Sequence, residues 1–443
     1  MNFEESLQYL LSLGHETLAI KLGLRNTELL LEKLDHPERA FPSVQIAGTN
    51  GKGSTAVLLD SICRAAGIST GVFTSPHLVS ITERIRVEGR EISEEDFARF
   101  ASEVRSAADS LVAAGTLAAL PTFFEQVTAI ALMAFSQAKV KLAILETGLG
   151  GRLDATTVAG AAIIAITPLA LDHQEYLGET LSEIAAEKAA IIRPGVTAII
   201  AAQPAPALEV ILRHCAEAGV EPSLDQDQSR SSIEGVTNDG RLVVTFETDE
   251  ALYEKVRIGL RGRHQIVNTS VAIRLAESLR RLGFAVSQDA IIEGTEAARH
   301  AGRLELVDGQ PSWLFDGAHN PAGAQALRDY LDEFVKQPIT VVFGAMNDKR
   351  LEEMAAILFP VADRLIVTQP DSVRAANVDR LQDLAGPIVG PENVTAARSV
   401  REALRLARSL TPANGLICVT GSLYLLGEVR AIMQKSGDLK SEI

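Results

Sequence analysis

Short apolar runs alternate with longer segments of helical spacing along most of this chain, and this alternation constrains its fold more than any other feature. The first series of runs covers residues 44–47, 70–73, 141–146, 161–167 and 197–201, and the second covers 313–315, 339–343, 364–368 and 416–420. Short runs that carry almost no charge inside are typical of strands buried on both faces. Because these strands alternate with helical segments, they predict parallel sheets flanked by crossover helices. The predicted fold class is α/β.

Between the two series lies a segment of different character. Residues 225–240 are rich in Ser, Asp, Gln and Gly with little periodicity, and the run at 242–246 alternates like an exposed strand. This pattern predicts a hairpin or a small sheet. Helical spacing then returns at 265–282 and again at 287–298.

Two series of strands favour two domains, and the length of 443 residues agrees with about 100–200 residues per domain. We place the boundary near residue 298. The first domain then covers 1–298, and a smaller Rossmann-like α/β domain covers 299–443. Residues 435–443 form the predicted disordered tail.

The charge balance argues against polyanionic partners. The chain has 42 basic and 57 acidic side chains, a net charge of −15, so its overall field repels nucleic acids and anionic membranes. The spacing of Cys63, Cys215 and Cys418 supports neither a disulfide framework nor a cysteine metal site and fits a reducing compartment. The first residues lack the features of a signal peptide, and no apolar run approaches the ~20 residues of a membrane span. We therefore expect a soluble cytoplasmic protein. We also expect a monomer that acts on small molecules and has neither a nucleic-acid nor a membrane partner.

A glycine-rich loop follows the first predicted strand. It reads Gly48-Thr49-Asn50-Gly51-Lys52-Gly53-Ser54-Thr55 and precedes a helical run at 56–66. This order lets backbone N–H groups and the helix N-terminus bind a phosphate chain, and Lys52 can reach the β- and γ-phosphates. The spacing is a variant, because two residues rather than four separate Gly48 from Gly51, and Gly53 intervenes before Ser54. The sequence predicts a phosphate-loop ATPase domain in which Gly51, Lys52, Gly53 and Ser54 bind ATP.

Further clusters stand at strand ends or helix starts. They are Thr74-Ser75-Pro76-His77-Leu78 with Glu83-Arg84-Ile85-Arg86, Thr122-Phe123-Phe124-Glu125, residues 146–156, Leu171-Asp172-His173, Glu187-Lys188-Ala189, Gly262-Arg263-His264-Gln265 with Asn268, Gly302-Arg303, and Asp316-Gly317-Ala318-His319-Asn320-Pro321. Together with the phosphate loop, and in this order, they resemble the folylpolyglutamate synthase and dihydrofolate synthase family of the Mur ligase superfamily, whose bacterial members are often bifunctional. The resemblance spans most of the chain and implies an enzyme of folate biosynthesis.

Glu146 ends an otherwise apolar strand, where a carboxylate is costly to bury unless it meets a cation. Magnesium prefers oxygen ligands and shares them with substrate phosphates, so Glu146 and the Ser75 hydroxyl are natural partners for it. The resemblance implies the same two metal ligands and adds His173. The residues alone leave a structural role for His173 as the alternative.

Lys188 lies in a helical stretch at 181–192, where a lysine is ordinarily a solvated surface charge. The resemblance implies instead that carbon dioxide carbamylates this lysine, which turns a cation into an anion that can hold a second magnesium ion or position groups around it. A buried lysine loses its proton readily, as that reaction requires. The implied cofactors are two magnesium ions and a carbamylated Lys188, with ATP as co-substrate.

The segment Thr122-Phe123-Phe124-Glu125 opens a helical run, where two phenylalanines are ordinarily core residues. The resemblance places this segment and Leu153-Asp154-Ala155 around a pterin ring, where an aromatic face can stack and a carboxylate can accept hydrogen bonds from ring N–H groups. Thr157 stands where the family commonly has asparagine.

In the second half, Asp316 closes the strand at 313–315, and His319 precedes Pro321 at a helix start. A helix cap is a sufficient structural explanation of this cluster. The resemblance implies that Asp316 and Arg303 contact the nucleotide. It also implies that Asn268 holds the adenine.

The implied catalytic set is Lys52, Lys188 and His319. Residues 347–349 follow another strand end and either face glutamate or form a plain turn.

The resemblance implies ATP-dependent amide ligation. A substrate carboxylate takes the γ-phosphoryl group to become an acyl phosphate, and the amine of L-glutamate then displaces phosphate. The acceptor is dihydropteroate, a folate, or both. Two alternatives stay open: a UDP-muramyl amino-acid ligase of the same superfamily, and a non-catalytic binding protein that uses the nucleotide as a switch.

Overall fold

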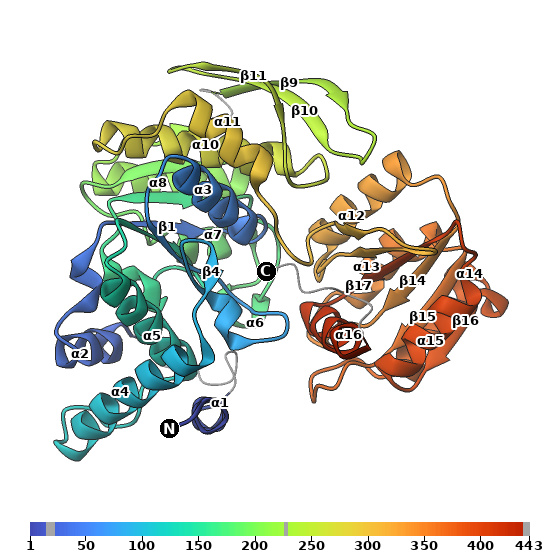
Figure 1. Cartoon of the computed structure of the whole chain (residues 1–443), viewed down its shortest axis with the longest axis horizontal. Helices are drawn as coiled ribbons and strands as arrows, with labels where there is room; N and C mark the ends of the chain where they lie inside the picture. Colours follow the sequence, from blue (N-terminus) through green and yellow to red (C-terminus); the bar gives the residue numbers. More distant parts are fainter. Residues whose placement is uncertain (15–22, 226–228, 437–443) are drawn as a thin grey trace.

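The computed structural model describes residues 1–14, 23–225 and 229–436. Two α/β units lie side by side, each built on its own large sheet (Figure 1). The first unit runs from α1 (Phe3–Ser12) through α11 (Gln288–Ala297), and the second from β12 (Glu305–Val307) through α16 (Leu423–Ser436). The predicted α/β fold class is confirmed.

The first unit has an eight-stranded sheet ordered β4-β3-β2-β5-β1-β6-β7-β8. Its strands are β1 (Ser43–Ala47), β2 (Thr70–Phe73), β3 (Ile85–Val87), β4 (Arg90–Glu91), β5 (Leu142–Glu146), β6 (Ile163–Ile166), β7 (Thr197–Ile200) and β8 (Ser223–Leu224). The six strands from β2 to β8 in this order pair in parallel, and β3 and β4 add an antiparallel edge. All the strands predicted for this half are present.

Helices cover both faces of this sheet. One face carries α3 (Lys52–Ala65), α10 (Gln265–Arg281) and α11, and the other carries α4 (Glu94–Ala113), α5 (Phe123–Ala138), α7 (Leu181–Ala189) and α8 (Ala205–Ala218). Side chains alternate along each strand, so Ile163 joins the core beneath α3 and Ile164 joins the core beneath α7 and α8. The unit also contains α2 (Arg25–Lys33), α6 (Gln174–Leu177) and the 3-10 helices η1 (Pro37–Ala40), η2 (Ile81–Arg84) and η3 (Ala155–Ala159).

The segment predicted as a hairpin or small sheet forms a three-stranded antiparallel sheet. Its strands are β9 (Ser229–Val236), β10 (Leu242–Thr248) and β11 (Leu252–Arg257), in the order β11-β10-β9. Val244, Phe246 and Tyr253 bury one face of it in the same core as α10. It therefore extends the first unit (Figure 1), and no residue of these three strands lines the cavity between the units.

The second unit has a six-stranded sheet ordered β12-β13-β17-β14-β15-β16, parallel except for the β12–β13 pair. Its further strands are β13 (Ser312–Phe315), β14 (Ile339–Phe343), β15 (Arg364–Thr368), β16 (Val394–Ala397) and β17 (Leu416–Thr420). One face carries α12 (Pro321–Phe334), α13 (Leu351–Leu358) and α14 (Val378–Val389), and the other carries α15 (Val400–Leu410) and α16. Two 3-10 helices, η4 (Phe359–Val361) and η5 (Pro391–Asn393), complete the unit.

Several element boundaries differ from the sequence prediction, among them those of α3 and α16. Helix α3 begins at Lys52 rather than at residue 56, because Gly51 adopts a left-handed conformation (φ +88°) that turns the loop directly into the helix. Lys435 lies in α16 rather than in a tail, and residues 437–443 lie outside the described residues. Among the described helices, none combines the length and the hydropathy that crossing a bilayer requires.

Candidate active site

A cavity of about 530 Å³ opens between the two units, at the C-terminal ends of β1, β5 and β6. Nearly all of the site residues predicted from the sequence line it, from both units. These are Gly51, Lys52, Gly53, Ser54, Ser75, Thr122, Phe124, Glu125, Glu146, Leu153, Asp154, Ala155, His173, Lys188, Asn268, Arg303, Asp316 and His319. Residues far apart in the sequence thus line one cavity.

Phe123 is the exception. Its side chain is 5% exposed and packs in the apolar core beneath the sheet, with the Arg84 guanidinium 5.4 Å from its ring centroid. Successive residues of a helix point about 100° apart, so Phe124 faces the cavity while Phe123 faces the core. The structure therefore gives Phe123 a packing role.

Hydrogen bonds to backbone carbonyls fix the conformation of the phosphate loop. The N–H groups of Thr49 and Asn50 both donate to the Pro168 carbonyl, at 3.2 and 3.1 Å, and the Lys52 amine donates to the Thr49 carbonyl at 3.3 Å. A Cβ at Gly51 would collide with the Asn268 side chain. No side chain caps the start of α3 among the described residues, so its first N–H groups are available to an anion.

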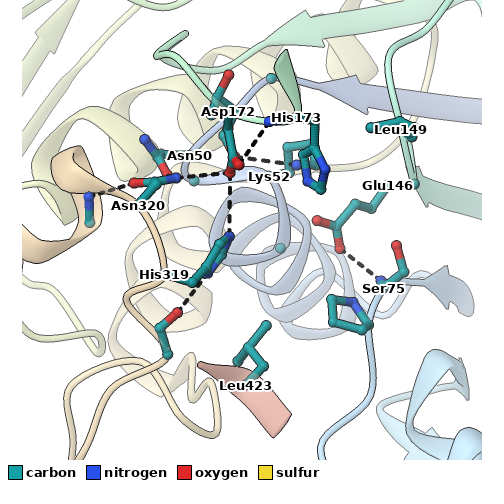
Figure 2. A pocket seen from close by; sticks show the side chains of 18 of the residues that line it. Asn50, Lys52, Ser75, Glu146, Leu149, Asp172, His173, His319, Asn320 and Leu423 are labelled. Carbon is teal, nitrogen blue, oxygen red and sulfur yellow. Dashed lines mark hydrogen bonds and ion pairs between the residues drawn. The ribbon is translucent and has the colours of Figure 1, made fainter. Parts of the chain in front are cut away.

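Glu146 is a buried carboxylate with little compensation. Its side chain is 4% exposed, and one oxygen accepts a hydrogen bond from the Ser75 backbone N–H at 3.1 Å (Figure 2). Burial raises the pKa of Glu146, although the charges of Lys52, Arg303 and Arg84 and the Ser75 hydrogen bond oppose this shift. A carboxylate whose burial outweighs these opposing charges is suited to a further cation.

A metal ion at this site needs ligands beyond the protein. In the part of the chain that the structure describes, no three His, Cys, Asp or Glu side chains gather closely enough to hold one. Magnesium takes such further ligands from water and substrate phosphates, and the predicted ligands Ser75, Glu146 and His173 all line this cavity.

Lys188 is buried rather than solvated, with 4% of the residue exposed. Burial, with the nearby charge of Lys52, lowers the pKa of its amine to about 7, while Asp172 and Asp154 act in the opposite direction. Within the described residues, no carboxylate forms an ion pair with Lys188. A substantial fraction of this amine is therefore neutral at neutral pH.

The carboxylates predicted to face a pterin are already engaged by their own loops. Asp154 accepts hydrogen bonds from the N–H groups of Gly148 (2.8 Å), Leu149 (3.1 Å) and Thr156 (3.0 Å) and from the Thr156 hydroxyl. Burial nevertheless raises the pKa of Asp154. Asp154 thus shapes the cavity wall at 148–156.

Glu125 closes a capping box at the start of α5, where it accepts from the Thr122 N–H at 2.6 Å. Its other oxygen accepts from the Thr27 hydroxyl at 3.2 Å. Glu125 therefore also holds the local backbone that borders the cavity.

Asp172 joins the two units. The Asn320 amide donates to it at 3.1 Å, and His319 Nε2 lies 3.5 Å away (Figure 2). The Lys349 amine also donates to it, at 2.6 Å. Burial raises the pKa of Asp172, but the hydrogen bond and charge of His319 and the charges of Lys349 and His173 outweigh it and hold the pKa well below its ordinary value.

The same Asn320 amide reaches the phosphate loop, where it donates to Asn50 Oδ1 at 3.1 Å. The sequence alone predicts no role for Asp172, and it leaves Lys349 open between glutamate binding and a plain turn. The available signal was a carboxylate following a buried strand. Its partner Lys349 lies 177 positions away, and nothing in the sequence around Lys349 indicates this pairing.

Asp316 and Arg303 lie together on the second unit's side of the cavity. Asp316 accepts from the N–H groups of Leu304 (2.9 Å) and Ala318 (3.0 Å), and Arg303 donates to the Gly317 carbonyl at 3.3 Å. Burial raises the pKa of Asp316, with Arg303 opposing. On the opposite wall, the Asn268 amide donates to Gln265 Oε1 at 2.8 Å.

This geometry agrees with what the chain resembles. The Mur ligase middle domain family matches residues 46–276, and the family described as "Mur ligase, glutamate ligase domain" matches residues 302–423. The dihydrofolate synthase/folylpolyglutamate synthase of Bacillus subtilis is 35% identical over 94% of this chain and 96% of its own length. The chain belongs to the folylpolyglutamate synthase/dihydrofolate synthase family of Mur ligases.

Some members of this family are longer. The probable bifunctional folylpolyglutamate synthase/dihydropteroate synthase of Halobacterium salinarum is 37% identical over 97% of this chain, which spans 51% of that relative's length. The chain thus covers about half of such a relative and nearly all of the Bacillus protein.

Solved structures of the family superpose over almost the whole chain. The Mycobacterium tuberculosis folylpolyglutamate synthase complexed with ADP has a TM-score of 0.89 at 32% identity, covering 97% of this chain and 99% of the other. The Escherichia coli FolC protein in complex with DHPP and ADP has a TM-score of 0.87 at 31% identity, covering 99% of both chains. A bifunctional folylpolyglutamate synthase/dihydrofolate synthase with manganese, AMPPNP and L-glutamate bound has a TM-score of 0.84 at 28% identity, covering 98% of both chains.

Proposed function

We propose that this chain is an ATP-dependent amide ligase that adds L-glutamate to dihydropteroate, to the glutamyl tail of folates, or to both. The observation that carries this proposal is the shared cavity, in which the uncapped start of α3 and Lys52 face Arg303, Asp316 and His319 from the second unit. We also propose a domain boundary near residue 298, between α11 and β12.

Phosphate binding falls to the loop and to Lys52. The free N–H groups at the start of α3 bind the β- and γ-phosphates, and the Lys52 ammonium offsets the charge that develops on the transferred phosphoryl group. Gly51, Gly53 and Ser54 let the loop approach the phosphates closely. Asn268 on α10, with Arg303 and Asp316 from the second unit, positions the rest of the nucleotide.

The acceptor carboxylate attacks the γ-phosphorus, ADP leaves, and an acyl phosphate forms. The amine of L-glutamate then attacks the acyl carbon, phosphate leaves, and the amide remains. No side-chain nucleophile is needed, because both steps depend on positioning and charge stabilisation. The ties from Asp172 to Lys349 and Asn320 hold the second unit over the cavity, which excludes water from the acyl phosphate.

We propose that Ser75, Glu146 and His173 hold magnesium together with the phosphates of ATP. A divalent ion there neutralises phosphate charge during transfer. The manganese-bound relative supports a divalent ion in this family. Glu146 and Ser75 lie in contact, which brings two of these three groups to one point of the cavity.

We propose that Lys188 is carbamylated and helps to hold a second magnesium ion. Its buried amine, with a pKa lowered to about 7 by burial and by Lys52, has the neutral form that carbon dioxide requires. Loss of the lysine's positive charge also removes its repulsion from Lys52.

We propose that Thr122, Phe124, Glu125 and residues 153–155 bind the pterin, with Phe124 as the stacking surface. The relative in complex with DHPP and ADP supports a second ligand beside the nucleotide in this family. A monomeric state and a cytoplasmic location stay predictions for this chain.

The test uses purified enzyme with ATP, L-glutamate and either dihydropteroate or tetrahydrofolate. Oxygen-18 in the acceptor carboxylate should appear in the released phosphate, and ADP release should require both glutamate and the acceptor. Label that stays wholly in the amide contradicts an acyl phosphate. ADP release without glutamate and acceptor favours a nucleotide switch, and turnover only with UDP-muramyl acceptors favours a cell-wall ligase.

A further inference from the structure

His300 lies in the linker between the two units and touches the phosphate loop. The linker follows α11, which packs so closely on α3 that a Cβ at Gly294 would collide with the backbone of Ile62. From Gly294 beside Ile62 the chain continues to His300 beside Ser54, so residues 294–300 lead from the second half of α3 to its start. His300 is thereby placed against the phosphate loop.

Two contacts join His300 to the loop. Its Nδ1 lies 3.2 Å from the Ser54 hydroxyl. A Cβ added at Gly53 would lie 3.0 Å from His300 Cε1 and 3.3 Å from Glu146 Oε2, so the imidazole covers Gly53 beside Glu146.

Ser54 is the middle of a hydrogen-bond chain. The Asn268 amide donates to Gln265 Oε1 at 2.8 Å, and Gln265 Nε2 donates to the Ser54 hydroxyl at 3.4 Å. Since Gln265 Nε2 is always a donor, the Ser54 oxygen accepts from it and can give its own proton to His300 Nδ1. Burial, with the charges of Arg303 and Arg86, lowers the pKa of His300 well below its ordinary value, which keeps the imidazole neutral and able to accept.

We propose that His300 is a positioning residue that couples the linker between the units to the phosphate loop, by holding the Ser54 hydroxyl and by covering Gly53. This inference rests on the proposed function, because it requires that the loop binds ATP. The residues that contact His300 bind the nucleotide, so its loss affects nucleotide binding before it affects the acceptor or glutamate.

The experiment measures the Kd of magnesium-AMPPNP for the full-length protein, and the KM values for ATP, acceptor and glutamate. His300→Phe keeps a ring over Gly53 but removes the hydrogen bond, so we expect Kd and the KM for ATP to rise about tenfold, as the loss of a buried hydrogen bond allows. The KM values for acceptor and glutamate should stay within about twofold of the wild-type values, because His300 contacts residues that bind the nucleotide and not these substrates.

Conservative variants separate positioning from bulk. Asn places a polar atom where Nδ1 lies, and Gln reaches toward the position of Nε2 instead. We therefore expect His300→Asn to restore part of the nucleotide affinity, because it keeps the hydrogen bond to Ser54 but not the ring over Gly53. We expect His300→Gln to bind the nucleotide no better than His300→Phe. His214→Phe is the matched control, because His214 lies on α8 outside the cavity, with Nδ1 3.0 Å from the Val210 carbonyl.

A double-mutant cycle tests the partner. If His300 acts through Ser54, the two changes are not additive. The Kd of the double variant Ser54→Ala/His300→Phe should then be no higher than the higher of the two single-variant Kd values. Additive losses, an unchanged Kd in His300→Phe, or equal increases in all three KM values would overturn the inference while the wild-type enzyme still binds AMPPNP. A wild-type protein that binds no AMPPNP overturns the proposed function as well.

Discussion

Glu146 and Asp172 are two buried carboxylates at the same edge of the first sheet, but their surroundings are opposite. Glu146 accepts one hydrogen bond, from the Ser75 N–H, and its pKa is raised by burial. Asp172 meets Lys349, Asn320 and His319, and its pKa is lowered although burial acts against it.

This difference separates two uses of a buried charge. The protein itself compensates Asp172, and the compensating groups come from the second unit, so this carboxylate holds the units together. The protein leaves Glu146 mostly uncompensated inside a cavity, which is costly unless a ligand brings the missing positive charge. A carboxylate that lowers stability without its ligand is a better candidate for function than one that is fully paired.

The largest expected effect is that of removing the charge of Glu146. Glu146→Gln removes the charge that we propose holds the metal ion, so turnover should fall about 10³-fold, as when a group that stabilises a charged transition state is lost. The thermal midpoint without nucleotide or metal should not fall, because the amide is cheaper to bury. Steady-state kinetics and calorimetry measure both.

Glu38→Gln is the matched control, since Glu38 is also a buried glutamate but lies outside the cavity. Wild-type turnover in Glu146→Gln would remove the proposed metal role.

The second largest effect is that of removing the charge of Asp172. Asp172→Asn leaves Lys349 and His319 facing a neutral amide, and breaking a buried pair in this way costs about 3–5 kcal/mol. We expect urea unfolding to shift to lower denaturant and to separate into two transitions as the units uncouple. Asp60→Asn is the control, because Asp60 bonds Thr70 and Arg64 within the first unit alone. Equal single transitions in both variants would show that Asp172 does not hold the units together.

A third, smaller effect is the pH dependence of stability without divalent ions. A raised folded-state pKa at Glu146 means that stability declines as pH rises above the unfolded value of 4.5. A lowered folded-state pKa at Asp172 means that its contribution is present above the unfolded value of 3.8 and is lost as pH falls below it. Urea titrations between about pH 3 and pH 7 measure both contributions.

The two variants should alter opposite ends of this pH range. Relative to wild type, Glu146→Gln should lessen the decline above pH 4.5, and Asp172→Asn should lessen the loss in acid. If Glu146→Gln instead lessened the loss in acid, and Asp172→Asn lessened the decline above pH 4.5, the contrast between the two carboxylates would be wrong.

The sequence predicted the buried strands well and the edges poorly. The predicted ranges of β2, β14, β15 and β17 match their observed bounds, because strands buried on both faces must be apolar throughout. β4 is only Arg90–Glu91 and lies exposed at an edge, so it has no such signature. β16, Val-Thr-Ala-Ala, is another edge strand, and its small residues do not distinguish it from a loop.

The site could be predicted in outline for a related reason. The carboxyl ends of parallel strands meet at one edge, so the clusters at Gly48 and Glu146 had to converge. The direction of one side chain against its neighbour, as at Phe123 and Phe124, depends on the exact rotation of α5. The pairing of Asp172 with Lys349 depends on how the linker orients the two units, which no local pattern encodes.

The smallest expected effect concerns a second contact between the units, away from Asp172. Leu78, three residues after Ser75, packs against the core of the second unit, and its carbonyl lies so close to Gly427 on α16 that a Cβ there would collide with it. Gly427→Ala should therefore cost about 1–2 kcal/mol, since the backbone at Leu78 must move. Gly386→Ala on α14 is the control, because its Cβ meets open space and alanine favours a helix.

If Asp172 and Leu78 hold the same interface, Gly427→Ala and Asp172→Asn together should lose less stability than the sum of the single losses, because the second change acts on units that the first has already separated. Urea unfolding of the four proteins measures this coupling. Strictly additive losses would mean that the two contacts act independently, and that Asp172 alone does not decide whether the units stay together.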